Sequence, residues 1–214
     1  MLHKLVIFIA LLIPIAATAC SGHSDKSATA QTDLPDQDST PAAPRVRPMP
    51  DRPTGSAFIV VSKRDRTLSV YDYQADGSTA MVAQFPCCMG KNKGDKVGRG
   101  DMRTPESPAG KPFKITMIQD ASTWKHDFGD GRGSIKAYGH WFLRLATPGH
   151  QGIGIHGSTN NENTVPGRAS EGCIRLLDKD IITLKEHFAY VGMPVIVQAE
   201  EQAPFDWELR ARQR

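Results

Sequence analysis

Long runs of one charge and long apolar segments are both absent from this sequence of 214 residues. Lysine and arginine number 26 against 23 for aspartate and glutamate, and no basic block reaches five residues. Because nucleic-acid binding needs a concentrated positive surface, this charge pattern argues against a nucleic-acid partner. No residue type is frequent or rare enough to indicate a collagen-like, wholly disordered or multi-span membrane protein. The composition leaves one globular domain with an attached segment.

The attached segment is N-terminal. An apolar run of 15 residues, 5–19, is interrupted by Pro14 and is shorter than the roughly 20 residues that span a membrane. We therefore predict that residues 1–19 are a secretory signal peptide. The run ends Ala17-Thr18-Ala19-Cys20, which resembles the bacterial lipobox. That resemblance implies lipidation of Cys20, with ordinary signal cleavage as the alternative.

The resemblance also implies a location. The residue after the cysteine is Ser21 rather than aspartate, which is associated with sorting to the outer membrane. Residues 20–55 are rich in Ser, Asp, Thr, Ala, Gln and Pro and almost lack large apolar side chains, which predicts a disordered tether. We expect an exported protein that a lipid holds in the cell envelope, facing the periplasm.

Short apolar runs predict a mainly β, sandwich-like domain over residues 56–199. One helix is expected, capped by Asp178 or Asp180, with apolar residues at helical spacing as far as Val191. Residues 200–214 are expected to be a charged tail. The predicted strands cover 58–61, 68–71, 80–88, 113–118, 141–145, 153–156 and 195–197.

The cysteines point to chemistry. With Cys20 assigned to the lipid, Cys87, Cys88 and Cys173 remain, an odd number for an exported protein, in which thiols usually pair. Adjacent strand residues point to opposite faces, so we interpret Cys87 and Cys88 as small buried residues rather than a metal or redox pair. Cys173 follows Gly172 in a stretch that could turn its N–H groups toward one point and form an oxyanion hole.

A thiol with a pKa of about 8.5 needs a nearby imidazole to act as a nucleophile at neutral pH. His156 ends an apolar strand 17 residues upstream of Cys173 and precedes Gly157. We expect the two side chains to form a thiolate–imidazolium pair. Zinc is not expected, because no Cys-x-x-Cys or His-x-x-x-His spacing completes a ligand set. The other histidines considered are His126, His140 and His150, which are rivals on composition alone, and His187, assigned to the helix surface.

Two motifs in this order resemble a known family. Ile155-His156-Gly157-Ser158, followed by Ser170-Glu171-Gly172-Cys173-Ile174-Arg175-Leu176, is similar to the signature of L,D-transpeptidases with a YkuD-type domain. Residues 100–106 resemble the family's Thr-Pro segment, and the likeness runs from about residue 58 to residue 197. One departure is Glu171, where the family usually has histidine.

The resemblance implies acyl transfer without a cofactor or metal. Cys173 would attack the L-centre of a diamino acid in a peptidoglycan tetrapeptide stem, release D-alanine and hold the donor as a thioester. An amine on a second stem would then form a 3-3 cross-link. Water as the acceptor would make the enzyme an L,D-carboxypeptidase or other hydrolase, and a non-catalytic wall-binding lipoprotein is a third possibility. Stem peptides are the expected partners of a monomer.

The resemblance also implies roles within the site. His156 is expected to be the base and the Gly157 carbonyl to orient its ring. Ser170, Gly172 and Cys173 would form the turn that binds the oxyanion. Four further residues have two open interpretations each: Arg175 binds a carboxylate or braces loop carbonyls, Glu171 binds a substrate ammonium or is solvated, and Tyr138 and Trp141 line the donor cleft or belong to the core. A papain-like or NlpC/P60-type peptidase is disfavoured because its cysteine precedes its histidine.

Overall fold

The structure, a computed structural model, describes residues 55–213. The predicted signal peptide, the predicted lipidation at Cys20 and all but the last residue of the predicted tether lie outside the described residues. Within the described part of the chain, none of the helices combines the length and apolar character that crossing a membrane requires.

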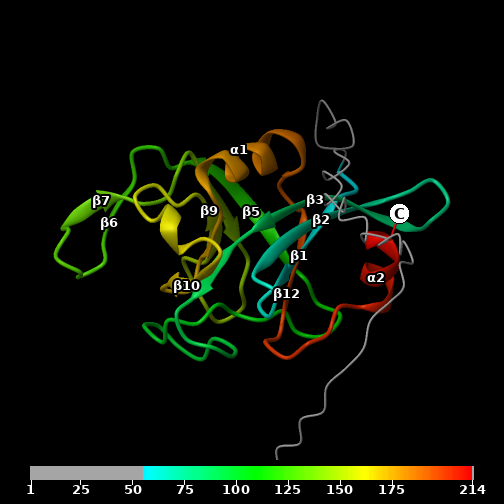
Figure 1. Cartoon of the computed structure of the whole chain (residues 1–214), viewed down its shortest axis with the longest axis horizontal. Coiled ribbons are helices and arrows are strands. Elements are labelled where there is room, and N and C mark those ends of the chain that lie inside the picture. Colours follow the sequence, from blue (N-terminus) through cyan, green and yellow to red (C-terminus); the bar gives the residue numbers. More distant parts are fainter. Residues whose placement is uncertain (1–54, 214) are drawn as a thin grey trace, which may run out of the picture. The chain divides into compact units, whose positions relative to one another are not determined.

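Strands dominate the described residues, as predicted (Figure 1). The predicted strands are all present, although 80–88 is divided at Cys87 because β3 pairs with β2 whereas β4 pairs with β10 and β11. The strands are β1 (Phe58–Ser62), β2 (Thr67–Tyr73), β3 (Thr79–Pro86), β4 (Cys88–Gly90), β5 (Phe113–Asp120), β6 (Lys125–Asp127), β7 (Ser134–Lys136), β8 (Trp141–Leu145), β9 (Gly154–His156), β10 (Gly167–Ser170), β11 (Ile174–Arg175) and β12 (Pro194–Gln198), and the helices are α1 (Asp178–His187), α2 (Asp206–Arg212) and the 3-10 helix η1 (Glu162–Thr164).

One continuous sheet connects ten of the strands in the order β10-β4-β11-β9-β8-β5-β12-β1-β2-β3. Strand β5 is the junction: Phe113 and Lys114 pair with β12, and the residues from Ile115 onward pair with β8, with a register shift between Ile115 and Met117. An irregularity of this kind bends the strand and increases its twist. The apolar residues of both halves, such as Val61 and Ile155, then share one buried cluster.

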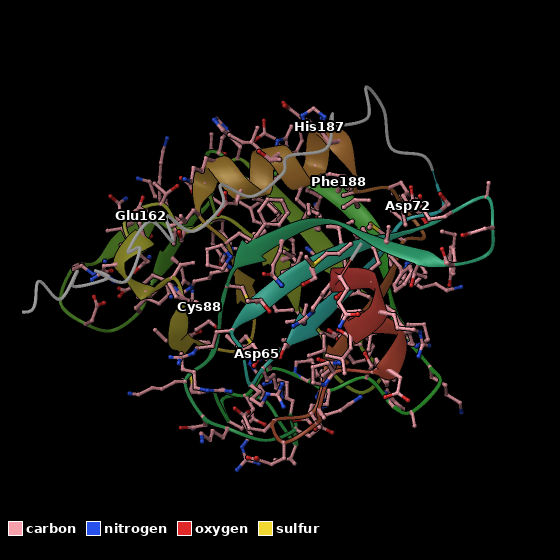
Figure 2. All side chains as sticks on the ribbon, turned by 45° about the vertical axis from the view of Figure 1, so that its right-hand side comes forward. Asp65, Asp72, Cys88, Glu162, His187 and Phe188 are labelled. Carbon is pink, nitrogen blue, oxygen red and sulfur yellow. The ribbon has the colours of Figure 1, made fainter. Side chains whose placement is uncertain are left out.

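Helix α1 covers this core with Ile181 and Leu184, which are fully buried, and with Phe188 just after its end (Figure 2). The expected cap is wrong, because the N-cap residue is Leu177 and it makes no side-chain cap hydrogen bond. Val191 lies beyond the helix and is 62% exposed, so it is not part of the apolar face.

The side chain of Asp178 binds the loop after β9 instead of capping the helix. Its carboxylate accepts hydrogen bonds from the Ser158 N–H, at 2.7 Å, and from the Thr159 hydroxyl. Both donors follow β9, so the first residue of α1 fixes the loop that leaves His156. These two hydrogen bonds supply the donors for a carboxylate that the sequence pattern assigned to the helix N-cap.

The charged C-terminal segment contains helix α2, which the sequence analysis did not predict. Its Glu208 is 1% exposed and accepts hydrogen bonds from the Phe205 N–H and from Gln198 Nε2, each at 2.7 Å. The Trp207 ring packs edge-on against Tyr71 of β2, with ring centroids 5.0 Å apart. A buried, fully bonded carboxylate and an aromatic contact therefore hold this segment on the sheet.

Candidate active site

A cavity of about 830 Å³ opens beside strands β8, β9 and β11. Four separate parts of the chain line it, so the fold assembles the cavity from segments that are distant in sequence. They are the loop at 96–102, the β6–β7 hairpin and the residues after it at 126–138, the segment from β8 to β9 at 144–156, and the turn and strand at 170–175.

His156 lies at the end of β9 and is 3% exposed. Its Nδ1 is 2.7 Å from the Gly157 carbonyl oxygen, the contact that the sequence analysis expected. A carbonyl can only accept, so Nδ1 carries the proton in this contact and Nε2 is left as the acceptor. The ring stacks on Phe142 of β8 with centroids 5.6 Å apart, and Tyr138 lies 4.8 Å away.

The surroundings of His156 keep its ring neutral. Burial, together with the positive charge of Arg175, lowers the pKa of His156 to about 3, although the hydrogen bond to Gly157 acts in the opposite direction. A ring that is neutral at physiological pH has a nitrogen free to accept a proton, which is one condition for a general base.

Cys173 is half-buried, lines the cavity and immediately precedes β11. Ile174 pairs with Ile155, so the fold brings the cysteine next to the beginning of β9. Its Sγ is 3.4 Å from the Gly152 carbonyl oxygen. Burial raises the pKa of the Cys173 thiol, and a hydrogen bond from the backbone of Gly154 only partly offsets this effect.

These two pKa directions correct one expectation. The pKa of Cys173 is raised and that of His156 is lowered, so the resting site favours a neutral thiol and a neutral imidazole over a thiolate–imidazolium pair. The physical reason is burial, which disfavours both charged forms. Proton transfer is therefore expected to accompany attack on a substrate rather than to precede it.

The turn before the cysteine is held by Ser170. Its hydroxyl donates to the Cys173 carbonyl oxygen, at 2.5 Å, and accepts from the Gly172 N–H, at 3.1 Å. Gly172 has a φ of +137°, and a Cβ there would lie 2.8 Å from the Arg103 carbonyl oxygen, so glycine is required. The Gly172 N–H, expected to face an oxyanion, is instead engaged by Ser170.

Glu171 is not simply solvated. Its Oε2 is 3.3 Å from Nε2 of His126 on β6, and both residues line the cavity. Their side chains are 47% and 32% exposed, so this pair remains accessible to a molecule in the cavity. The histidine considered as a rival base is thus the partner of the residue that departs from the family pattern.

Arg175 is 4% exposed and lines the cavity. Its guanidinium carbon lies 5.1 Å from the centre of the Phe128 ring, and its buried Nε has no hydrogen-bond partner. A brace to loop carbonyls would satisfy that nitrogen, so the geometry favours the alternative, an arginine able to bind an anionic group.

The structure places the two predicted aromatic residues, Tyr138 and Trp141, in different surroundings. Tyr138 lines the cavity beside His156. Trp141 does not line it and packs against the core, with the Lys185 ammonium 4.4 Å from its ring centre. The cleft interpretation of Trp141 is therefore wrong, because its position on β8 turns it toward α1.

Sequence reasoning missed most of the positive charge of the cavity. Lys96, Arg99 and Arg144 join Arg175 in the lining, whereas Glu171 is the only acidic residue among the described lining residues. No local motif could identify them, because they come from loops and strands up to 79 positions apart in the chain. His150 lines the cavity as well, and His140 does not.

The remaining cysteines and possible metal ligands contribute no second site. Cys87 and Cys88 are both completely buried, as predicted, and Figure 2 shows Cys88 on its short strand. The described part of the chain contains no group of three or more His, Cys, Asp or Glu side chains arranged to hold a metal ion.

Comparisons with known proteins agree with this architecture. Residues 56–197 match the model of the family described as YkuD, L,D-transpeptidase catalytic domain. No curated protein matches the sequence. Among solved structures, Bd1075 from Bdellovibrio bacteriovorus is 18% identical with a TM-score of 0.51, over 77% of this chain and 56% of that one.

Two further structures are similar to this fold. An L,D-transpeptidase from Mycobacterium smegmatis is 20% identical with a TM-score of 0.49, over 67% of this chain and 59% of that one. The helical cell shape determining protein Pgp2 from Campylobacter jejuni is 22% identical with a TM-score of 0.48, over 73% and 52%. The aligned part of this chain thus spans little more than half the length of these proteins. The family match covers most of the described residues, and the chain belongs to the YkuD family of L,D-transpeptidase catalytic domains.

Proposed function

We propose that this protein is a peptidoglycan L,D-transpeptidase in which Cys173 is the nucleophile and His156 the general base. The observation that carries the proposal is the shared cavity: a half-buried thiol and a neutral imidazole whose free acceptor is Nε2 open into the same space from neighbouring strands. This is the arrangement that nucleophilic acyl transfer needs.

In the donor half of the reaction, the Cys173 proton moves to His156 Nε2 as the sulfur attacks the carbonyl of the L-centre of the stem's diamino acid. The C–S bond forms, and the Cys173 N–H is the proposed donor to the developing oxyanion. The C–N bond to D-alanine then breaks, and the departing amine takes the proton from His156. The product is a thioester and free D-alanine, with atoms and charge balanced.

The charge of the cavity supports a donor with carboxylates. D-alanine at the end of a tetrapeptide stem carries one, and an unpaired buried arginine such as Arg175 is suited to bind it. In the acceptor half, an amine of a second stem attacks the thioester, forms the C–N bond of a 3-3 cross-link and releases the Cys173 sulfur.

Incubation of the purified full-length protein with disaccharide-tetrapeptide, followed by mass spectrometry, tests the proposal. A cross-linked dimer supports transpeptidation, and Cys173→Ala should form none. A tripeptide without dimer would assign the same site to an L,D-carboxypeptidase, and no change in the substrate would leave a wall-binding role.

We also propose that the protein acts in the cell envelope, anchored by a lipid on Cys20 and sorted to the outer membrane because Ser21 follows that cysteine. The sequence 17–20 and the peptidoglycan-directed family support this location. Metabolic labelling with a clickable palmitate analogue in a Gram-negative host tests it. Labelled wild type with unlabelled Cys20→Ala is expected, and label on neither would refute the anchor.

A further inference from the structure

The pair formed by Glu171 and His126 is a feature of the cavity that the donor half of the proposed reaction does not use. The carboxylate belongs to the turn that ends at Cys173, and the imidazole comes from β6, with 3.3 Å between Oε2 and Nε2. Both side chains remain partly exposed within the cavity. A charged group beside the nucleophile therefore has no role so far.

The cavity presents a specific difficulty to an amine acceptor. A primary amine in water is mostly protonated, and the lining contains Arg99, Arg144 and Arg175, whose charges repel an ammonium group. The fourth cation of the lining, Lys96, is paired with Asp101 at 2.6 Å. Among the described lining residues, Glu171 offers the only negative charge. An incoming ammonium group is attracted to this position more than to any other part of the lining.

The carboxylate is also held in place. Ser170, its neighbour in the chain, is 1% exposed and bonded on both sides of the turn. On the other side, the His126 ring packs against Phe128 with centroids 4.5 Å apart, and Arg132 of the same hairpin bonds to Asn161 Oδ1 at 2.9 Å. The backbone that carries Glu171, two residues before Cys173, and the ring of its partner His126 are thus each held by contacts of their own.

We propose that Glu171, supported by His126, is the binding site for the ammonium group of the acceptor stem. The proposal rests on the function proposed above and adds to it a site that selects a primary amine over water. One proton of the bound ammonium passes to the Glu171–His126 pair and from there to solvent. The neutral nitrogen attacks the thioester carbonyl, the C–N bond forms and the C–S bond breaks.

The remaining proton balance involves His156 and Cys173, the pair proposed above. The nitrogen loses its second proton to His156, and His156 returns it to the departing Cys173 sulfur, which restores the thiol and the neutral ring. Water can follow the same route without needing Glu171, since it carries no positive charge. Removal of this charge is therefore expected to reduce transfer to the amine more than transfer to water.

The test measures how the acyl-enzyme of Glu171→Gln divides between transfer to an amine and transfer to water. Glutamine keeps an oxygen near His126 but removes the negative charge. Protein preloaded with tetrapeptide receives a fixed concentration of acceptor stem, and mass spectrometry gives the ratio of cross-linked dimer to tripeptide. We expect this ratio to fall at least tenfold. Glu186→Gln, the same change on the exposed side of α1 and outside the cavity, should leave it unchanged.

Two other results would overturn the assignment. An unchanged ratio in Glu171→Gln would show that the acceptor amine binds elsewhere, and loss of thioester formation would place Glu171 in the donor half. Failure of the wild type to form a thioester would instead contradict the proposed function itself. In a second variant, His126→Asn, the carboxylate remains but loses its support, so the ratio should fall less than in Glu171→Gln.

Discussion

The cavity has two unlike walls. One consists of strands β8, β9 and β11 within the ten-stranded sheet, where His156 and Arg175 are 3% and 4% exposed. The other is the two-stranded β6–β7 hairpin, which forms a separate sheet away from the core (Figure 1). His126 and Phe128 on this side are only half-buried.

The difference separates chemistry from recognition. A proton acceptor needs a fixed tautomer and a fixed position beside the nucleophile. The Gly157 carbonyl fixes the tautomer of His156, and the pairing of β9 with β11 fixes the position of its backbone. Substrate recognition needs accessible side chains, which the hairpin supplies at the cost of fewer contacts. We therefore expect substitutions in the strand wall to affect the chemical step and those in the hairpin wall to affect binding and partition.

The largest effect is expected in the strand wall from His156→Gln. Glutamine retains a similar size but cannot accept and return the proton, so thioester formation from tetrapeptide should slow about a thousandfold, within the range of a general base. Stopped mass-spectrometric sampling of D-alanine release measures it.

The matched control is His150→Gln, another histidine that lines the cavity. It should retain activity within a few-fold. Equal losses in the two variants would contradict the assignment of His156, and an unaffected His156→Gln variant would transfer the role of base to another group.

The second largest effect concerns the loop that lines the cavity at residues 96–102. Lys63 is 1% exposed and donates to the carbonyl oxygens of Gly94 and Thr104 and to Glu106, at 2.9, 2.5 and 2.8 Å. Burial lowers the pKa of Lys63, but the pair with Glu106 opposes this. Lys63→Met leaves these acceptors unpaired and should lower the free energy of unfolding by about 3 kcal/mol, measured by urea denaturation.

Lys93→Met changes an exposed lysine on the same loop and should alter the free energy of unfolding by less than about 0.5 kcal/mol. If both variants are equally stable, the buried lysine does not hold this loop in place.

The strand wall is also the part that the sequence could predict. Val, Ile and Phe runs identify β1, β5, β8 and β9, because burial on a pleated sheet selects such residues. That His156 and Cys173 approach each other was expected because a nucleophilic thiol needs a nearby imidazole and because the two motifs resemble the family signature. Their order in the sheet, with β11 beside β9, is a long-range pairing that no local pattern encodes.

The hairpin wall could not be predicted in this way. β6 and β7 have three residues each and are largely exposed, so they lack an alternating apolar pattern. The pair of Glu171 and His126 joins residues 45 positions apart, and the burial of Glu208, a residue of α2, likewise depends on tertiary contacts. In both cases the sequence shows the polar residues, but no local pattern indicates that they contact each other.

The third effect is a dependence of stability on pH. The pKa of His156 is about 3 in the folded protein and about 6.5 when unfolded, so above pH 6.5 both states are neutral and stability does not change. As the pH falls from 6.5 toward 3, the unfolded state binds a proton that the folded state does not. The free energy of unfolding should then decline by up to about 1.4 kcal/mol per pH unit from this group.

Other groups titrate in the same range, so the measurement compares wild type with His156→Gln by urea denaturation at pH 7.5, 6.5, 5.5 and 4.5. The difference in unfolding free energy, wild type minus variant, should be constant above pH 6.5 and decrease below it. A difference that stays constant down to pH 4.5 would mean that the ring is protonated in the folded protein.

The smallest effect is expected in the hairpin wall from Phe128→Leu. This ring lies 5.1 Å from the Arg175 guanidinium carbon, a contact worth roughly 0.5–1 kcal/mol in a partly exposed setting. Leucine keeps the apolar contact but removes the ring, so KM for tetrapeptide should rise two- to fivefold while kcat changes little. Phe142→Leu makes the same substitution under His156 in the strand wall and should lower kcat instead. Loss of kcat in both variants would mean that the hairpin also positions the reacting groups, and that the two walls do not divide the work as proposed.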